Sequence, residues 1–266
     1  MKILPPEFFL IQDILVVIIS FVISILFFYF TDWIKKKGLA SQYFTRKLIH
    51  LALAPIFLFT FLLYSGEWFS PWIAVIIPIV YFIAILLINL DIIKLSQLTT
   101  TMSRSGDPRE LLRGIAYYLV VVIIVCIVGW SSYPLLSWYS PLAIFVISIL
   151  AVGDGLADIV GRKMNRYKFK IFAEKSIPGS VAMFVSSLVA CLAFLMIFGY
   201  DVLSMIFLTL VIVGVATLVE AISPGDMDNI TVPLTTVIVY ILITPLLVPF
   251  TEWSLLSLPF PNDFKN

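Results

Sequence analysis

The chain alternates long apolar stretches with short polar connections. Eight stretches of about 17 to 23 residues are almost wholly apolar, at residues 8–30, 48–64, 70–90, 114–130, 140–160, 179–198, 202–222 and 231–250. About 20 apolar residues span a bilayer as a helix, and a helix satisfies its own backbone hydrogen bonds within lipid. The pattern predicts an all-α, polytopic integral membrane protein with about eight transmembrane helices.

The composition agrees with this pattern. Of the 266 residues, 61% are hydrophobic and only 12% are charged, whereas soluble domains carry about 25% charged residues. We find no soluble domain, linker or low-complexity segment, so residues 1–266 are expected to form a single transmembrane domain. The two cysteines lie in apolar runs and indicate neither a disulfide framework nor a zinc site, and nothing indicates a nucleic-acid partner.

The connections between the apolar stretches differ in charge. Fifteen of the 17 Lys and Arg residues lie in three alternate connections, at 31–47, 91–113 and 161–178. Because Lys and Arg accumulate in cytoplasmic loops, both termini are predicted to lie on the non-cytoplasmic side. No organelle address is evident, so we expect a prokaryotic plasma membrane. The polar chemistry of the chain then gathers at the cytoplasmic membrane interface.

Two carboxylates interrupt the fifth apolar stretch. Asp154 and Asp158 are four residues apart, so on a helix they lie on one face. Two like charges in an apolar segment are unfavourable unless a cation lies between them. Mg²⁺ prefers one or two carboxylates together with phosphate oxygens. We therefore predict that both residues are metal ligands in a Mg²⁺–phosphate site; the alternative is structural ion pairs with nearby arginines.

Glycines and basic residues surround these carboxylates. Small residues allow a ligand or another helix to approach the backbone closely, and a helix N-terminus with Ser and Gly is a ready anion site. A polyphosphate cradle is predicted here; the alternative is a positive-inside loop that contacts anionic lipid headgroups. The candidate phosphate-binding residues of this segment are Gly153, Gly155, Gly161, Arg162, Lys163, Lys175, Ser176, Gly179 and Ser180.

Two further basic groups precede apolar stretches. Arg46 and Lys47 come just before His50, which is the only histidine in the chain. His50 is interpreted either as a structural hydrogen-bonding residue or as a group that binds phosphate or positions a hydroxyl. Arg109 and Arg113 precede the fourth stretch and add to the positive field, unless Arg113 is engaged in an ion pair along its own helix.

An acidic group follows the seventh apolar stretch. Glu220 ends that stretch, and Asp228 and Asn229 follow in the next connection. They are interpreted either as a solvated turn or as a second carboxylate cluster that faces the basic loops and contacts a metal, a hydroxyl or a nucleotide. Asp13 lies near the opposite side by topology and is assigned no role. No Walker A, GxGxxG or protein-kinase motif is present.

Five motifs resemble those of the polyprenol kinase family, which includes phytol, farnesol and dolichol kinases and is distantly related to phosphatidate cytidylyltransferase. They run from the second apolar stretch to the eighth, and their order and spacing are more specific than any one of them. The motifs are RKLIH at 46–50, PRELLRG at 108–114, GDGLADIVGRK at 153–163, EKSIPGS at 174–180, and the segment from 220 to 234 that ends in DMDNITVPL.

The resemblance implies a kinase that transfers a phosphoryl group, commonly from CTP and with Mg²⁺, to a long-chain isoprenoid alcohol of the phytol, geranylgeraniol or dolichol type. It makes residues 1–266 a catalytic domain that binds a nucleoside triphosphate, a lipid alcohol and membrane lipids. The candidate catalytic residues are Asp154, Asp158, Lys175, Glu220 and His50. The sequence departs from the family pattern at Ile115, where Pro is frequent, and at Asp226-Met227-Asp228, where two adjacent acidic residues are frequent.

Two other functions are compatible with parts of this pattern. A cytidylyltransferase would use the same metal and basic segment for attack on the α-phosphate of CTP, and would release pyrophosphate. A transporter or flippase would use intramembrane carboxylates as ion sites. Polar residues gather almost wholly at one face of the membrane rather than along a path through it, which disfavours transport.

Overall fold

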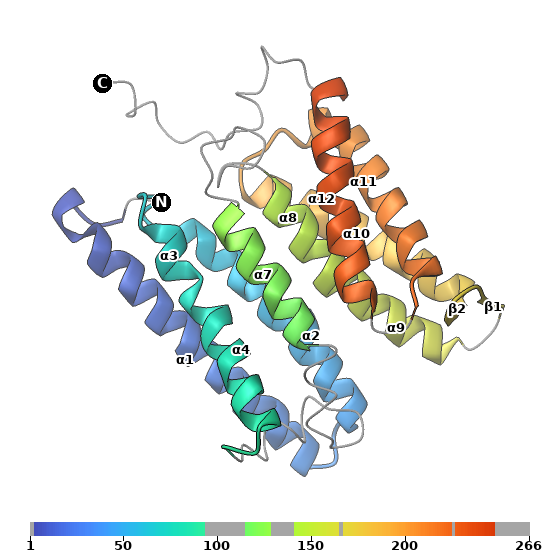
Figure 1. Cartoon of the computed structure of the whole chain (residues 1–266), viewed down its shortest axis with the longest axis horizontal. Coiled ribbons are helices and arrows are strands. Elements are labelled where there is room, and N and C mark those ends of the chain that lie inside the picture. The colour runs from blue at the N-terminus through green and yellow to red at the C-terminus, as the bar shows by residue number, and fades with distance from the viewer. Residues whose placement is uncertain (1–2, 94–114, 129–140, 165–166, 225–226, 248–266) are drawn as a thin grey trace.

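A computed structural model describes residues 3–93, 115–128, 141–164, 167–224 and 227–247. It is a bundle of helices that run up and down along a common direction (Figure 1). The main helices are α1 (Phe9–Lys36), α2 (Gln42–Thr60), α3 (Ser70–Ala74), α4 (Ile76–Asn89), α7 (Tyr117–Val128), α8 (Leu142–Ser148), α9 (Asp154–Lys163), α10 (Ile177–Ile197), α11 (Val202–Ile222) and α12 (Asp228–Leu247). Short 3₁₀ segments, η1 (Pro6–Phe8) and η2 (Phe61–Leu63), extend α1 and α2.

The membrane-spanning character predicted from the apolar stretches is confirmed. Within the described residues, seven helical segments are long and apolar enough to cross a membrane, and α7 is a shorter apolar helix. Apolar side chains such as Ile14, Ile18 and Leu26 cover the outside of α1, where lipid takes the place of a protein core. The chain is thus an all-α multi-pass membrane protein, in which α1 begins and α12 ends at the same end of the bundle (Figure 1). Which end faces the cytoplasm stays a prediction.

The most buried segment is the helix that carries the paired aspartates. In α8, Leu142 and every residue from Ile144 to Ser148 are buried, and α8 packs against α2, α7, α10 and α12. A π-helical turn, η4 (Ile149–Gly153), joins α8 to α9. Such turns widen a helix locally and are frequent at functional sites. Here the turn lies directly before Asp154.

Several helices begin earlier or end later than the apolar pattern predicts. Helix α2 begins at Gln42 rather than 48, so Arg46 and Lys47 lie inside the helix. Helix α9 continues to Lys163, so Arg162 and Lys163 occupy its last turn instead of a loop. The hydropathy boundary is wrong at these ends because charged side chains are tolerated on a helix where they pair with one another, as they do here.

The connection between α9 and α10 contains a β-hairpin that the sequence did not predict. Strands β1 (Lys168–Lys170) and β2 (Glu174–Ser176) pair antiparallel, with Phe169 opposite Lys175. Side chains alternate between the two faces of a strand. Lys168 and Glu174 accordingly form an ion pair, while Lys175 lies on the other face of the hairpin and points toward the bundle. Residue Ser176 ends β2 and caps α10, since its side chain accepts a hydrogen bond from the Gly179 backbone amide.

Candidate active site

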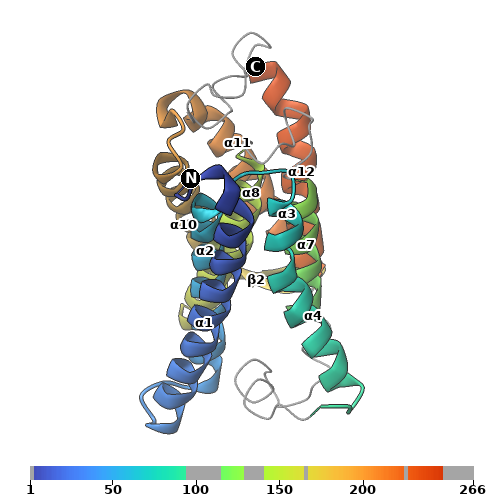
Figure 2. The same cartoon turned by 90° about the vertical axis from the view of Figure 1, so that its left-hand side faces the viewer.

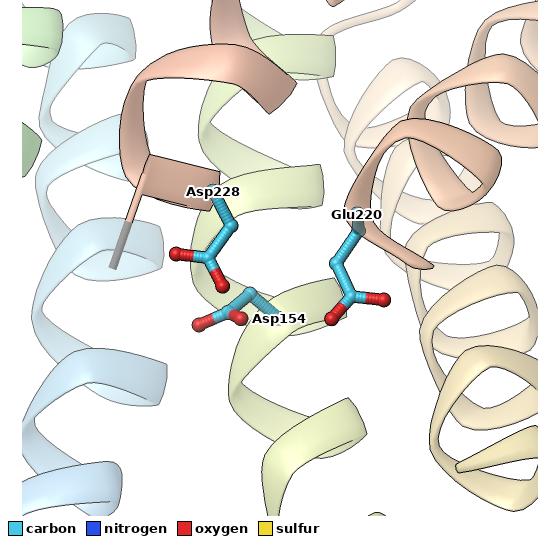
Figure 3. A group of neighbouring side chains, drawn as sticks. All are labelled: Asp154, Glu220 and Asp228. Atoms are coloured by element: carbon cyan, nitrogen blue, oxygen red, sulfur yellow. The ribbon is translucent and has the colours of Figure 1, made fainter. Parts of the chain in front are cut away.

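Three carboxylates from three helices converge near one end of the bundle. Asp154 begins α9, Glu220 lies near the end of α11, and Asp228 begins α12, and one carboxylate oxygen of each lies within 4.8 Å of the others. Figure 3 shows the three side chains pointing toward one another. Glu220 is only 3% exposed. Like charges held this close are unfavourable without a cation.

Lys175 provides one of the cations at this cluster. Its ammonium group forms an ion pair with Glu220 and lies 3.2 Å from the Asp228 carboxylate. Burial by itself lowers the pKa of the Lys175 ammonium, but the negative charges of Glu220 and Asp228 outweigh burial and hold that pKa above its ordinary value. The hairpin therefore places an ammonium group with a raised pKa beside the carboxylates.

Asp158 lies among basic side chains instead of among carboxylates. It accepts a hydrogen bond of 2.7 Å from Arg162 Nε, one turn further along α9. Its second oxygen is 2.9 Å from Lys47 Nζ and 3.9 Å from Arg46 Nη2, both on α2. The Arg162 guanidinium lies over the ring of Tyr43, 4.6 Å from the ring centroid, in a cation–π contact. The alternative interpretation of the two aspartates, ion pairs with basic residues, therefore describes the surroundings of Asp158.

Asp154 stands between the two groups. Its carboxylate is 3.6 Å from Lys47 Nζ and 3.9 Å from His50 Nε2, and it also takes part in the cluster with Glu220 and Asp228. In the structure Asp154 thus groups with the acidic residues of α11 and α12, and not with Asp158. Metal ligation by Asp154 and Asp158 together stays a prediction, and the geometry offers Asp154, Glu220 and Asp228 as a different set.

The π-helical turn has a direct consequence for His50. The Asp154 amide donates to the carbonyl of Ile149 rather than to that of Leu150, its partner in a regular α-helix. The Leu150 carbonyl instead lies 3.0 Å from His50 Nε2. A carbonyl only accepts, so Nε2 carries the hydrogen, and in the neutral imidazole Nδ1 is an acceptor. The structure therefore fixes the tautomer of the one histidine, next to the carboxylates.

The glycines around the aspartates lie at contacts between helices. A Cβ atom added to Gly153 would lie 2.0 Å from Ser187 Oγ on α10, and one added to Gly155 would lie 2.7 Å from a methyl carbon of Leu51 on α2. At Gly179 such an atom would lie 3.1 Å from the Ala157 carbonyl oxygen and 3.4 Å from the Cα of Gly161. Of the two roles expected for these glycines, close approach of a ligand or of another helix, the structure shows the approach of another helix.

The start of α10 also carries an available hydroxyl. Ser176 caps the helix, Gly179 donates to it, and Ser180 follows one residue later. Within the described residues, the Ser180 hydroxyl is buried and has no hydrogen-bond partner. Ser176, Gly179 and Ser180 all line the same cavity as the carboxylates. The Ile177 and Gly179 amides are engaged by the Tyr167 carbonyl and the Ser176 hydroxyl oxygen, and Pro178 has no N–H, so the start of α10 offers hydroxyls rather than backbone amides to an anion.

A cavity of about 680 Å³ connects this polar site to the membrane interior. Its polar end is lined by Arg46, Lys47, His50, Asp154, Asp158, Gly161, Arg162, Lys168, Glu174, Lys175, Ser176, Gly179, Ser180, Glu220, Asp228 and Asn229. Its second part, here called the apolar arm, lies between α1, α2, α4 and α7. The residues of the apolar arm are Ser20, Ser24, Phe28, Leu53, Ala54, Ile56, Phe57, Thr60, Ile77, Pro78, Tyr81, Ile85, Ile115, Tyr118, Leu119, Val122 and Ile147.

Figure 2 shows α1 and α2 diverging from α4 and α7 toward the end at which α1 and α4 finish. The cavity is lined by all four helices. No sequence pattern indicates this arm, because most of its lining residues are ordinary apolar side chains of membrane helices. Tyr43 was also missed, although it lies three residues before Arg46 and therefore shares its helix face.

The remaining predicted site residues fall in two groups. Asn229 lines the polar end, and its backbone amide donates to the Asp228 carboxylate at 3.0 Å. Lys163 is exposed on the last turn of α9 and does not line the cavity. Arg109 and Arg113 lie outside the described residues.

The chain is similar to named plant enzymes over most of its length. It is 36% identical over 217 residues to "Probable phytol kinase 2, chloroplastic" of Oryza sativa subsp. japonica, which covers 79% of this chain and 69% of the relative. It is 33% identical over 237 residues to farnesol kinase of Arabidopsis thaliana, covering 86% and 75%, and 29% identical over 213 residues to phytol kinase 1 of that plant, covering 76% and 67%.

No family model matches the chain, and no solved structure matches it. The names of the relatives favour a kinase over a cytidylyltransferase or a transporter. The same names place the relatives in chloroplasts, so the expectation of a prokaryotic plasma membrane is not borne out.

Proposed function

The chain belongs to the polyprenol and phytol kinase family, and from that membership we propose that it phosphorylates a long-chain isoprenoid alcohol with CTP and Mg²⁺ at one face of the membrane. The lipid alcohol kinase activity follows from the family. CTP as donor rests on the resemblance of the motifs. Mg²⁺ and the position at the cytoplasmic membrane interface rest on the residues described above.

The observation that carries the proposal is the continuity of the cavity. One end gathers carboxylates, cations and a helix N-terminus, which suit a triphosphate, and the other end is apolar and lies at the depth of the membrane, which suits a prenyl chain. A kinase for a lipid alcohol must bring a water-soluble anion and a hydrocarbon to one reacting centre. The alcohol would enter from the lipid, and the nucleotide from the adjacent aqueous side.

We assign the metal site to Asp154, Glu220 and Asp228. Carboxylate oxygens are the ligands that Mg²⁺ prefers, with nucleotide phosphates and water completing its coordination, and one carboxylate oxygen of each residue already lies within 4.8 Å of the others. These three carboxylates would hold Mg²⁺, which would supply positive charge against the transferred phosphoryl group. Asp158 has another task in this scheme, because Arg162 and Lys47 already surround it.

The basic residues neutralise and position the triphosphate. Lys175 and Lys47 contact different members of the carboxylate cluster, since Lys175 pairs with Glu220 and Lys47 with Asp154. Asp158 holds Arg162 and Lys47 in place through its two oxygens. The Ser176 and Ser180 hydroxyls at the start of α10 add neutral donors. Phosphoryl transfer depends largely on such positioning and charge neutralisation.

The acceptor hydroxyl is placed beside His50, where the polar end meets the apolar arm. In the transfer, the alcohol oxygen forms a bond to the γ-phosphorus, and the bond from that phosphorus to the bridging oxygen of the β-phosphate breaks. The nucleoside diphosphate leaves, and the hydroxyl proton passes to Nδ1 of His50. Because Nε2 donates to Leu150, Nδ1 is the ring nitrogen that accepts. His50→Gln is expected to lower kcat more than it changes KM for the nucleotide.

The proposal is tested with full-length protein purified in detergent. Labelled phosphate is followed from γ-labelled CTP, ATP or UTP to phytol, geranylgeraniol, farnesol and a dolichol in the presence of Mg²⁺. We expect label in an isoprenoid alcohol, with CTP the preferred donor, and a large loss in Asp154→Asn. The matched control is Asp201→Asn, an exposed carboxylate that caps α11 at the other end of the bundle. Absence of labelled alcohol with all three nucleotides would overturn the proposal.

A further inference from the structure

One face of α2 follows the cavity from the polar end to the far end of the apolar arm. The lining residues recur at intervals of three and four, which is the spacing of one helix face. Along α2 they are Arg46, Lys47, Ile49, His50, Leu53, Ala54, Ile56, Phe57 and Thr60. The charged residues come first and the apolar ones after them, so position along α2 measures depth from the reacting centre.

The length of this face can be compared with a prenyl chain. A helix rises about 1.5 Å per residue, so Thr60 lies roughly 20 Å along α2 from Lys47 and roughly 15 Å from His50. With carbon–carbon bonds of about 1.5 Å, an extended chain of four isoprene units is roughly 20 Å long and one of three units roughly 15 Å. The arm therefore has the length of three to four isoprene units.

Thr60 lies at the closed end of the arm. It is the last residue of α2 and only 4% exposed. The next residues along the chain, Phe61 and Tyr64, are buried in the core. The side chain of Gln12 on α1 donates a hydrogen bond of 2.6 Å to the Leu63 carbonyl, which links the residues that follow Thr60 to α1. A chain that enters along α2 thus meets packed protein beyond Thr60.

Ser20, Ser24, Thr60 and Tyr81 are satisfied by the protein itself, whereas the hydroxyl of Tyr118, whose ring lies 4.9 Å from the His50 ring, is buried without a hydrogen-bond partner among the described residues. Below His50, the following bonds occupy the polar groups of the arm. The Ser20 hydroxyl donates to the Val16 carbonyl at 2.6 Å, and that of Thr60 donates to the Phe57 carbonyl at 2.7 Å. Ser24 and Tyr81 hydrogen-bond to each other across α1 and α4. These groups need no partner from a ligand. The occupant that fits the arm is therefore a hydrocarbon chain.

We propose that the apolar arm measures the prenyl chain of the acceptor alcohol, and that Thr60 sets the upper limit at about four isoprene units. The alcohol lies along α2 with its last methyl groups against Thr60 and its hydroxyl between His50 and Lys47, whose Nε2 and Nζ atoms lie 3.9 Å and 3.6 Å from the Asp154 carboxylate. The position of the hydroxyl rests on the proposed function. A dolichol is excluded from this binding mode, since a chain several times longer has no room beyond Thr60.

The experiment varies the closed end and measures binding without catalysis. Full-length protein in detergent is titrated with farnesol, geranylgeraniol and geranylfarnesol, which have three, four and five isoprene units, and affinity is taken from the shift of the thermal midpoint. Thr60→Phe shortens the arm and Thr60→Ala lengthens it. Phe59→Leu is the matched control, because Phe59 is 42% exposed on the other face of α2, against Phe194.

Thr60→Phe is expected to weaken the binding of geranylgeraniol at least about tenfold and to leave the affinity for farnesol within about twofold of the parent value. Thr60→Ala is expected to raise the affinity for geranylfarnesol relative to that for geranylgeraniol. Phe59→Leu is expected to leave the ratios of the three affinities as in the parent protein. Unchanged ratios in both Thr60 variants would overturn the proposal. If Thr60→Phe does not fold, the ratios in Thr60→Ala decide.

The phosphate-transfer assay, run on the same variants with the same three alcohols, separates this inference from the proposed function. Length-dependent binding without phosphate transfer to any alcohol would support selection of chain length by the apolar arm and overturn the proposed kinase function. Phosphate transfer at the same rate to all three alcohols in every variant would support the kinase function and overturn selection of chain length by the arm.

Discussion

Asp154 and Asp158 lie one turn apart on α9 and share a single cation, since Lys47 Nζ is 3.6 Å from the first carboxylate and 2.9 Å from the second. Their other partners differ completely. Asp154 faces Glu220 and Asp228, whereas Asp158 is bonded to Arg162. Two residues with the same spacing and chemistry in the sequence therefore have different surroundings, and their substitutions should have different consequences.

We expect Asp154→Asn and Asp158→Asn to be distinguished by their dependence on Mg²⁺. Loss of a ligand charge in Asp154→Asn should raise the Mg²⁺ concentration for half-maximal activity and lower kcat by roughly 10²-fold or more. Asp158→Asn should lower kcat by about 10- to 100-fold, since it only orients other groups, with little change in the Mg²⁺ requirement. Titrations of initial rate against Mg²⁺ for both variants check this. The same shift in both would return Asp158 to the metal site.

Lys175 should stay protonated throughout the neutral range. Its pKa is raised in the folded protein by Glu220 and Asp228, so its contribution to stability is fully present below its ordinary pKa of about 10.4 and is lost as pH rises through the higher folded value. The thermal midpoint of Lys175→Met should therefore lie below that of the parent protein by a constant amount from about pH 7 to about pH 9.5. A gap that closes below about pH 9 would contradict this.

The activity of the Lys175 variants gives a second measure of the same charge. Lys175→Met should lower kcat by roughly 10²-fold, because a cation beside the transferred group is lost and the buried Glu220 carboxylate loses its ion pair. Lys175→Arg keeps the charge and should recover part of the rate. Equal loss in both variants would show that the charge is not what matters at this position.

Gly153 is expected to be required for packing rather than for chemistry. Gly153→Ala places a methyl group 2.0 Å from Ser187 Oγ, and overpacking of this kind destabilises by about 1–3 kcal/mol. Ser187→Ala removes the clashing atom, and its Cβ would lie 3.4 Å from the new methyl, so the double variant should regain most of the loss. Thermal midpoints of the two single variants and the double variant check this. Additive losses would contradict the contact.

Asp13 is expected to stabilise the end of the bundle away from the active site. Its buried carboxylate accepts hydrogen bonds from the Ser65 amide at 2.7 Å, the Ser65 hydroxyl at 3.0 Å and the Ser70 hydroxyl at 2.5 Å. Asp13→Ala leaves the Ser65 amide and at least one hydroxyl buried without an acceptor, since Ser65 Oγ and Ser70 Oγ are 3.1 Å apart and only one can donate to the other; each lost partner costs about 1–3 kcal/mol.

The thermal midpoint should therefore fall clearly in Asp13→Ala and less in Asp13→Asn, which keeps one acceptor oxygen. The kcat of protein that remains folded should be unchanged at low temperature in both variants. A large fall in kcat without a fall in the midpoint would contradict a structural role.

The spans could be predicted from the sequence because the bilayer imposes one requirement on every helix that crosses it. Runs such as 202–222 coincide with the helix in the structure, since apolar length alone decides them. The helix start at Gln42 was not predictable in this way. Lys47 is only 8% exposed there, and its buried charge is stabilised by ion pairs with Asp158 and Asp154. Those partners are more than one hundred positions away in the sequence, so no local pattern predicts the helix start.

The sequence by itself determined the class of the protein and the inventory of its site. Hydropathy required membrane helices, and the motifs brought Asp154, Lys175, Glu220 and Asp228 to attention before any contact was known. Only the tertiary structure decided how these residues are grouped, since helix packing at Gly155 and Gly179 sets which side chains meet. It also decided the apolar arm, because a cavity between α1, α2, α4 and α7 is a property of their separation and leaves no pattern in any one of them.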